Sequence, residues 1–478
     1  MNDIREKVIS SLFWRFAERM GAQGISFIVS IVLARLLEPE YYGTVALVNV
    51  FTNILQVFVD SGMANALIQK RDADELDFST VFYFNMIMCT ILYVGIFFAA
   101  PFIADFYNDP ALISIVRVIS LTLIVSGLKN VQQAYVSRLM LFKRFFYSTL
   151  GGTIFSAILG ITLAYKGFGV WALVFQQLSN LVIDTLILWI TVKWRPKKLF
   201  SISRFKRLFS FGWKLLVSGL LDTVYTNLQS LIIGKKYTSE DLAYYNNGQK
   251  IPNIVVTNIN TSIGSVLLPT LSKEQGDPDL VKAHMRRSIQ VSSYILWPIM
   301  LGVAACSNSI IHLLLTDKWL PSVPYLQIAC IYYALMPIHT SNLQAITAMG
   351  RSDLFLKLEI IKKIVGVIAL IISVQFGVLA IALSSILTGI ISTIINAWPN
   401  RKLLGYNYIE QIKDIAPSFL LSSVMAMIVW EVDHISIFSN DILNLLVQIV
   451  LGGLIYILGS KFFHLESYEY IMNYLKKF

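Results

Sequence analysis

The sequence predicts an all-α, polytopic membrane protein with about fourteen transmembrane helices. Of its 478 residues, 56% are hydrophobic and only 14% are charged, whereas soluble domains carry roughly 25% charged residues. The mean hydropathy is +0.64. Apolar windows of about 20 residues, each long enough to cross the hydrocarbon core of a bilayer, recur from one end of the chain to the other. Most of the chain is therefore expected to lie in a membrane.

The expected spans follow one another with short connections. Pro39 and Glu40 suit the first turn of the helix that forms the second span. A proline there gives up no backbone hydrogen bond, and a glutamate there meets the positive end of the helix dipole. The apolar N-terminal segment lacks a short core followed by a small-residue cleavage site, so no cleaved signal peptide is expected. In chain order the spans are residues 11–36, 42–68, 80–103, 112–135, 147–165, 169–192, 212–234, 243–270, 288–315, 323–345, 357–375, 377–398, 415–431 and 442–461.

Charge alternates between successive loops and predicts the orientation. With a cytoplasmic N-terminus, the basic segments "SRLMLFKRFF", "KWRPKKLFSISRFKRLF" and "KEQGDPDLVKAHMRR" all lie inside, and most of the 39 Lys and Arg residues fall on that side. Excess positive charge marks cytoplasmic loops, so both ends are expected in the cytoplasm. The formal net charge of +10 is then explained without nucleic-acid binding. The outward loops are too short to hold a catalytic domain, which argues against an enzyme.

The two halves of the chain align weakly with each other. Since each half holds six spans, both begin on the same side of the membrane, which predicts a parallel repeat of the kind found in alternating-access transporters. We expect a six-helix lobe at 1–192, a basic cytoplasmic linker at 193–211, a second six-helix lobe at 212–400, and two additional helices with a tail at 401–478. Chance similarity between apolar segments is the alternative. A shift of 200 residues pairs Arg35 with Lys235, Glu40 with Glu240, Gly43 with Ala243, Asn53 with Asn253, and Asp60 with Asn260.

Polar residues form stripes at helical spacing inside three spans. Stripes facing lipid would be costly, so they are expected to face a water-accessible central cavity between the lobes. Hydrogen bonding between neighbouring helices is the alternative. The stripes are Asn49, Asn53, Gln56 and Asp60 in the second span, Thr122, Ser126, Lys129 and Gln133 in the fourth, and Asn246, Lys250, Asn253, Thr257 and Asn260 in the eighth.

Charged residues inside the spans have two interpretations each. Arg15 and Arg19, with Glu18 beside them, open the first span, and Lys214 opens the seventh. These bases either reach back to lipid headgroups or, with Arg117, Lys129 and Lys250, attract an anionic group such as a pyrophosphate, which guanidinium groups bind well. Glu18, Asp60, Asp184 and Asp222 are candidates for pairing with these bases or for coupling to a cation.

Cysteine and histidine give no sign of a metal or a cofactor. Cys89, Cys306 and Cys330 all fall within expected spans, which argues against disulfides. The five histidines lie far apart along the chain without the spacing of metal ligands. No metal and no cofactor are therefore expected.

Several runs together resemble one family. They are "LEPEYYGTVALV", "DSGMANALIQKRDADELDFSTVFYFN", "SRLMLFKRF", "GFGVWALVFQQL", "SEDLAYYNNGQKIPN" and "LLPTLSKEQGDPDLVKAHMRR". Their order and spacing resemble the Wzx-type polysaccharide flippases of the multidrug/oligosaccharidyl-lipid/polysaccharide exporter superfamily, in particular the WzxC and teichuronic-acid-exporter branch. The resemblance covers roughly residues 8–400.

The resemblance implies a fold and a task. The implied fold is MATE-like, with two six-helix bundles around a V-shaped cavity and often two extra helices. The implied task is outward movement of undecaprenyl-pyrophosphate-linked oligosaccharides across the cytoplasmic membrane, for capsule, lipopolysaccharide or exopolysaccharide. Family members place basic residues in the cavity, and Arg15, Arg19, Lys129 and Lys250 match best by position. The lipid bilayer, an H⁺ or Na⁺ counter-ion and a polysaccharide polymerase are the implied partners.

Two other classes remain as alternatives. A drug/cation antiporter of the same superfamily is expected to have an acidic cavity, whereas the internal charges here are basic or balanced. A membrane glycan polymerase or ligase is expected to carry a large outward loop with catalytic Arg or His, and the sequence contains no such loop.

Overall fold

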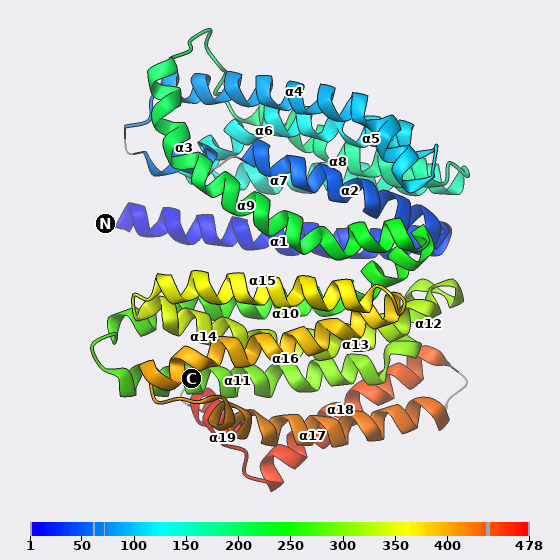
Figure 1. Ribbon diagram of the computed structural model, residues 1–478, viewed down its shortest axis with the longest axis vertical. Coiled ribbons are helices and arrows are strands. Elements are labelled where there is room, and N and C mark those ends of the chain that lie inside the picture. The colour runs from blue at the N-terminus through cyan, green and yellow to red at the C-terminus, as the bar shows by residue number, and fades with distance from the viewer. Residues whose placement is uncertain (1, 61–62, 71, 436–439, 477–478) are drawn as a thin grey trace. The chain divides into compact units, whose positions relative to one another are not determined.

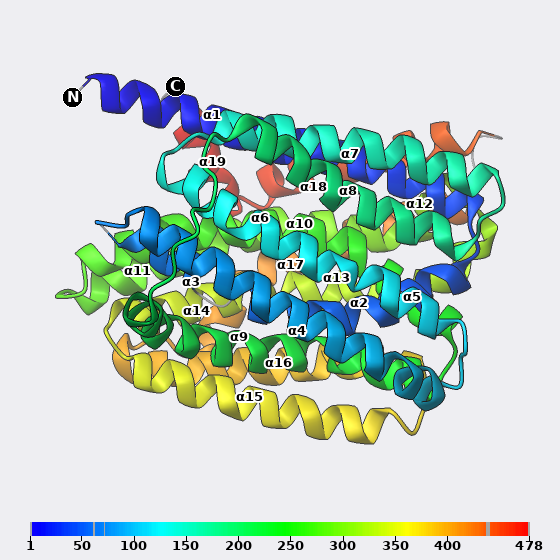
Figure 2. The same cartoon turned by 90° about the horizontal axis from the view of Figure 1, so that it is seen from above.

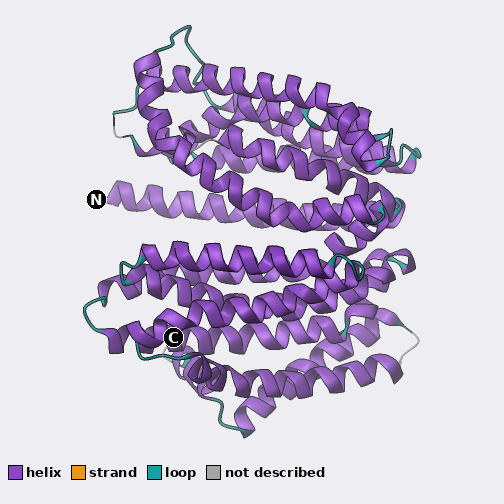
Figure 3. Ribbon diagram, viewed as in Figure 1, coloured by secondary structure: helices purple, strands orange, loops and turns teal. Residues whose placement is uncertain are grey.

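Helices make up almost all of the described chain, and no strand occurs within it (Figure 3). The computed structural model describes residues 2–60, 63–70, 72–435 and 440–476. Within these residues, 11 helices are long and apolar enough to cross a membrane. Helices satisfy all of their backbone hydrogen bonds internally, which a segment in hydrocarbon requires. The prediction of an all-α, multi-pass membrane protein is therefore confirmed.

The chain divides into two compact units, Met1–Ala243 and Tyr244–Phe478. Figure 1 colours the helices of each unit in chain order. The first unit contains α1 (Asn2–Leu36), α2 (Pro39–Asp60), α3 (Met63–Gln69), α4 (Glu75–Tyr107), α5 (Leu112–Ile119), α6 (Leu121–Arg138), α7 (Phe142–Tyr165), α8 (Val170–Thr191) and α9 (Ile202–Lys236).

The second unit begins inside the second turn of α10 (Ser239–Lys273). The remaining elements are α11 (Pro278–Ala305), α12 (Ser307–Leu315), the 3₁₀ helix η1 (Asp317–Ser322), α13 (Val323–Ala334), α14 (Met336–Ala348), α15 (Ser352–Ser373), α16 (Val378–Leu403), α17 (Tyr408–Ile435), α18 (Asp441–Phe462) and α19 (Glu466–Leu475). Within this unit α11 packs against α17, and α15 packs against α16.

Small residues let the helices of the first unit approach closely. α7 packs along both α1 and α8, and α7 and α8 run side by side in Figure 2. A Cβ atom at Gly152 of α7 would lie 2.7 Å from the carbonyl oxygen of Asn180, and one at Gly160 would lie 2.7 Å from Cγ of Gln176. Glycine at these two positions therefore permits the contact with α8, as small residues do in membrane helix pairs.

Several expected spans are interrupted in the structure. The fourth expected span comprises α5 and α6, which meet at Ser120, and the tenth comprises α13 and α14, which meet at Leu335. Pro337 has no N–H to donate and disfavours a regular helix before it. Neither α13 nor α14 is among the 11 membrane-length helices, and nor are α9 and α15. The count of fourteen spans therefore stays a prediction.

The segment before α9 packs against the first unit instead of extending as a free connection. Trp194 is 4% exposed and belongs to an apolar cluster with Phe78 and Phe82 of α4. Nε2 of Gln132 donates to the carbonyl of Trp194 at 3.0 Å, and the backbone N–H of Lys197 donates to Oγ of Ser79 at 3.0 Å. α9 itself contacts α2, α3 and α4. The predicted division into lobes and linker stays a prediction, but residues 193–201 are held to α4 and α6.

Candidate functional site

A polar pocket of about 340 Å³ lies within the first unit, between α2, α6 and α8. Each of the three helices contributes amides or hydroxyls that recur at helical spacing on one face. None of the lining side chains is charged, and all but one are polar. The lining residues are Thr52, Asn53 and Gln56 of α2, Thr122 and Ser126 of α6, and Gln176, Gln177, Asn180 and Leu181 of α8.

Hydrogen bonds fix the orientation of three amides at this pocket. Nε2 of Gln177 donates to Oδ1 of Asn49 at 3.0 Å, which joins α8 to α2. Nδ2 of Asn180 donates to Oγ of Ser156 on α7 at 3.1 Å. Nε2 of Gln56 donates to Oδ1 of Asp60, one turn along α2, at 3.3 Å. Each amide therefore uses one N–H bond of its NH₂ group within the protein.

A layer of charged residues lies one turn further along the same three helices. Nζ of Lys129 on α6 lies 2.5 Å from Oδ2 of Asp184 on α8, and their side chains are only 14% and 6% exposed. Nδ2 of Asn130 donates to Oδ1 of Asp60 at 3.3 Å. Lys129 and Asp184 thus neutralise each other, and Asp60 accepts from two amides.

The other predicted bases of the first unit lie away from the pocket lining. Arg15 pairs with the buried Glu18 at 2.7 Å, and its guanidinium lies 5.3 Å from the ring centre of Phe145. Oγ1 of Thr149 also donates to Glu18, at 3.3 Å. Arg117 donates to the carbonyl of Phe97 at 3.3 Å. Arg15 and Arg117 therefore have partners within their own unit.

Arg19 and Asp222 have exposed side chains, and the side chain of Lys214 lies outside the described residues. In the second unit, Lys250 and Asn253 of α10 are exposed, and Oδ1 of Asn253 accepts from Thr257 at 3.1 Å. Asn260 follows two turns later, with a half-buried side chain. Their predicted binding roles stay predictions.

Sequence reasoning missed the contribution of α8. Gln176, Asn180 and Asp184 recur at intervals of four residues, which is the same signal that marked the stripes in the second and fourth spans. Of this stripe, Asp184 is predicted from the sequence as a site residue, whereas Gln176 and Asn180 are not. Gln176 and Asn180 complete the pocket together with the predicted Asn53 and Gln56.

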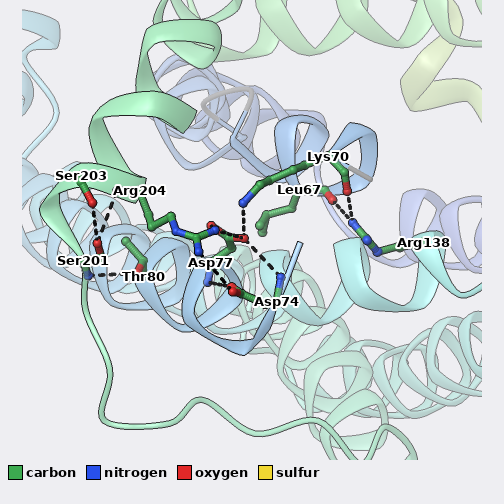
Figure 4. A network of polar contacts seen from close by, with 9 residues as sticks. All are labelled: Leu67, Lys70, Asp74, Asp77, Thr80, Arg138, Ser201, Ser203 and Arg204. Atoms are coloured by element: carbon green, nitrogen blue, oxygen red, sulfur yellow. Dashed lines mark hydrogen bonds and ion pairs between the residues drawn. The ribbon is translucent and has the colours of Figure 1, made fainter. Parts of the chain in front are cut away.

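A second polar network joins α3, α4 and α9 (Figure 4). The carboxylate of Asp77 is fully buried and accepts from Nζ of Lys70 at 2.5 Å and from the guanidinium of Arg204 at 3.2 Å. Asp77 also forms a capping box with Asp74 at the start of α4. The pKa of Asp74 lies below its usual range, first because the backbone N–H of Asp77 donates to it. The sequence places these residues in loops predicted to be cytoplasmic.

Metal ligands do not cluster in the part of the chain that the structure describes. No group of three or more His, Cys, Asp or Glu side chains there is arranged to hold a metal ion. The three cysteines are buried and form no disulfide with one another. The polar pocket between α2, α6 and α8 is thus a site of amides and hydroxyls.

The fold defines the class of protein. The chain is similar to the solved structure titled "Lipid II flippase MurJ, inward closed conformation", with a TM-score of 0.71, 16% sequence identity, and coverage of 96% of this chain and 98% of that chain. It is thus a multi-pass membrane protein with a transporter fold.

The family follows from the sequence comparison. The model of the family described as "Polysaccharide biosynthesis protein" matches residues 32–324, and the protein belongs to this family. It is 24% identical over 469 residues to the teichuronic acid biosynthesis protein TuaB of Bacillus subtilis, covering 96% of each chain. It is 23% identical over 464 residues to the succinoglycan biosynthesis transport protein ExoT of Rhizobium meliloti, covering 94% of this chain and 92% of the relative. The resemblance inferred from the sequence is therefore confirmed.

Proposed function

We propose that this protein is a flippase that moves undecaprenyl-pyrophosphate-linked oligosaccharides outward across the cytoplasmic membrane for surface polysaccharide biosynthesis. The observation that carries the proposal is an uncharged, polar pocket inside the membrane-spanning part of a chain whose relatives are named for polysaccharide biosynthesis and transport. Polar groups within membrane spans are costly and mark substrate pathways.

The mechanism is alternating access, in which the glycan headgroup passes through the protein while the polyprenyl chain stays in lipid. Both termini are cytoplasmic, in accordance with the distribution of Lys and Arg. α2, α6 and α8 then all run toward the cytoplasm, so the pocket lies outward of the Lys129–Asp184 pair. Arg19 and Lys250, whose side chains are exposed, remain our candidates for holding the pyrophosphate. An H⁺ or Na⁺ gradient drives the cycle, and a polymerase uses the exported units.

The pocket favours this function over the drug/cation antiporter of the same superfamily. Organic cations are attracted by carboxylates or aromatic faces, whereas this pocket is lined by neutral amides and hydroxyls. Of the two carboxylates one turn away, Asp184 is paired with Lys129. The other, Asp60, accepts from the amides of Gln56 and Asn130. An oligosaccharide, in contrast, offers many hydroxyl groups that bond to amides.

Depleting the protein in its native host is expected to stop surface polysaccharide production. Lipid-linked repeat units should accumulate on the cytoplasmic face, because their synthesis continues without export. Mass spectrometry of extracted lipids measures the accumulation, and an impermeant glycosidase added outside distinguishes the two faces. A plasmid copy of the gene should restore export. Unchanged polysaccharide, or units that accumulate on the outer face, would contradict the proposal.

A further inference from the structure

The pocket between α2, α6 and α8 presents hydrogen-bond donors and acceptors but no charge. The NH₂ groups of Gln56, Gln177 and Asn180 each donate one of their two N–H bonds within the first unit, so each amide keeps one N–H donor and its carbonyl acceptor. Oγ1 of Thr122 likewise donates to a backbone carbonyl, that of Ile119, at 2.6 Å. A ligand that fits this pocket should therefore be neutral and able both to donate and to accept hydrogen bonds.

Three further lining side chains can both donate and accept, namely the amides of Asn53 and Gln176 and the hydroxyl of Ser126. A sugar hydroxyl also donates and accepts, so it matches such a mixed surface. A volume of about 340 Å³ lies at the lower end of the range for ligand sites, which is roughly 300–1,000 Å³. The pocket has room for a small part of an oligosaccharide.

Anionic groups fit this pocket poorly. A pyrophosphate or carboxylate is charged, and an ion that leaves water is costly to bury without an opposite charge beside it. Lys129, one turn away, is already neutralised by Asp184 at 2.5 Å. Arg15 forms an ion pair with Glu18, and Arg117 donates to the backbone carbonyl of Phe97. Lys129, Arg15 and Arg117 thus each have a partner within the first unit.

We infer that this pocket binds an uncharged sugar residue of the glycan through its hydroxyl and acetamido groups, and that it excludes both the pyrophosphate and acidic sugars. The inference rests on the proposed flippase function, and it assigns to the first unit a role in recognising the glycan. Asn53 and Gln176 determine this specificity, because they carry both donors and acceptors. The carboxylate of Asp60, which accepts from the lining residue Gln56, repels anions.

Ligand-observed NMR on the full-length protein in lipid nanodiscs tests the inference. The probes are glucose, galactose and N-acetylglucosamine as neutral sugars, and glucuronate and inorganic pyrophosphate as anions. At least one neutral sugar should give a saturation-transfer signal. Asn53→Leu and Gln176→Leu should each weaken that signal about fivefold, as expected for the loss of one hydrogen bond. Gln133→Leu, an amide of α6 outside the pocket lining, is the matched control.

Gln176→Lys provides a gain-of-function variant. It places a cation at the pocket and should add a saturation-transfer signal from glucuronate, or ³¹P line broadening of pyrophosphate, that the wild type lacks. The inference is overturned if the wild type binds only the anions, or if neutral-sugar signals are the same in all folded variants. Transport of lipid-linked oligosaccharide is measured separately on the wild type. Transport by a protein whose pocket does not prefer neutral sugars over anions would contradict the inference alone. Absence of transport would contradict the proposed function, whatever the pocket binds.

Discussion

Replacing Asp77 with alanine is expected to destabilise the protein by about 3–5 kcal/mol, the usual cost of removing one partner of a buried ion pair. The carboxylate of Asp77 is fully buried and bonds to both Lys70 and Arg204. The substitution leaves both cations without this acceptor. It also removes half of the capping box at α4, which adds about 1 kcal/mol.

Thermal unfolding in detergent, followed by tryptophan fluorescence, measures the effect of Asp77→Ala. Glu75→Ala is the matched control, because Glu75 is 49% exposed and lies 3.9 Å from its partner Lys197. Exposed pairs of this kind contribute at most about 1 kcal/mol. Asp77→Asn should fall between the two, since its amide oxygen still accepts hydrogen bonds. Equal unfolding midpoints for Asp77→Ala and Glu75→Ala would show that the network does not hold α9 to α4.

Separating Lys129 from Asp184 is the second change with a large expected effect. Lys129→Met alone leaves a buried carboxylate without its cation and should lower the unfolding free energy by about 3–5 kcal/mol, as should Asp184→Leu alone. The two side chains are 14% and 6% exposed, so water offers little compensation. The double variant removes both charges and should recover most of the lost stability, as apolar replacements of buried pairs do.

The transport activity of the double variant distinguishes a structural role of this pair from a role in substrate binding or cation coupling. If Lys129 and Asp184 only hold α6 to α8, the folded double variant should keep at least half of the wild-type transport rate. The yield of monodisperse protein and the unfolding midpoint report folding, and a vesicle assay reports transport. A double variant that folds but does not transport would contradict a purely structural role for this pair. It would favour a role for these residues in substrate binding or cation coupling.

Hydropathy predicts the all-helical, multi-pass character of this chain, because a segment in lipid must be helical and long enough to cross the bilayer. Interruptions at Ser120 and Leu335 do not follow from hydropathy, since both lie within continuous apolar windows. The burial of Trp194 is a tertiary effect as well, because the surrounding sequence is basic and the side chain packs against residues distant in sequence such as Phe78 and Phe82.

At the site, too, the sequence predicts which residues share a helix face but not which residues of different helices meet. Asn53, Gln56, Thr122 and Ser126 share helix faces, so their periodicity predicts a common polar surface, and they do line one pocket. The partners of the charged residues are set by the fold. Lys129 meets Asp184 across 55 positions of sequence, and spacing on a single helix carries no information about such a contact.

Transfer of a fluorescent undecaprenyl-pyrophosphate oligosaccharide between the leaflets of proteoliposomes tests the central claim most directly. Purified protein should move the lipid at least tenfold faster than protein-free vesicles do, with quenching by an impermeant reductant as the readout. Vesicles holding the same amount of an unrelated multi-pass protein control for bilayer defects. A rate equal to that control, from protein that remains folded and monodisperse, would contradict the assignment as a flippase.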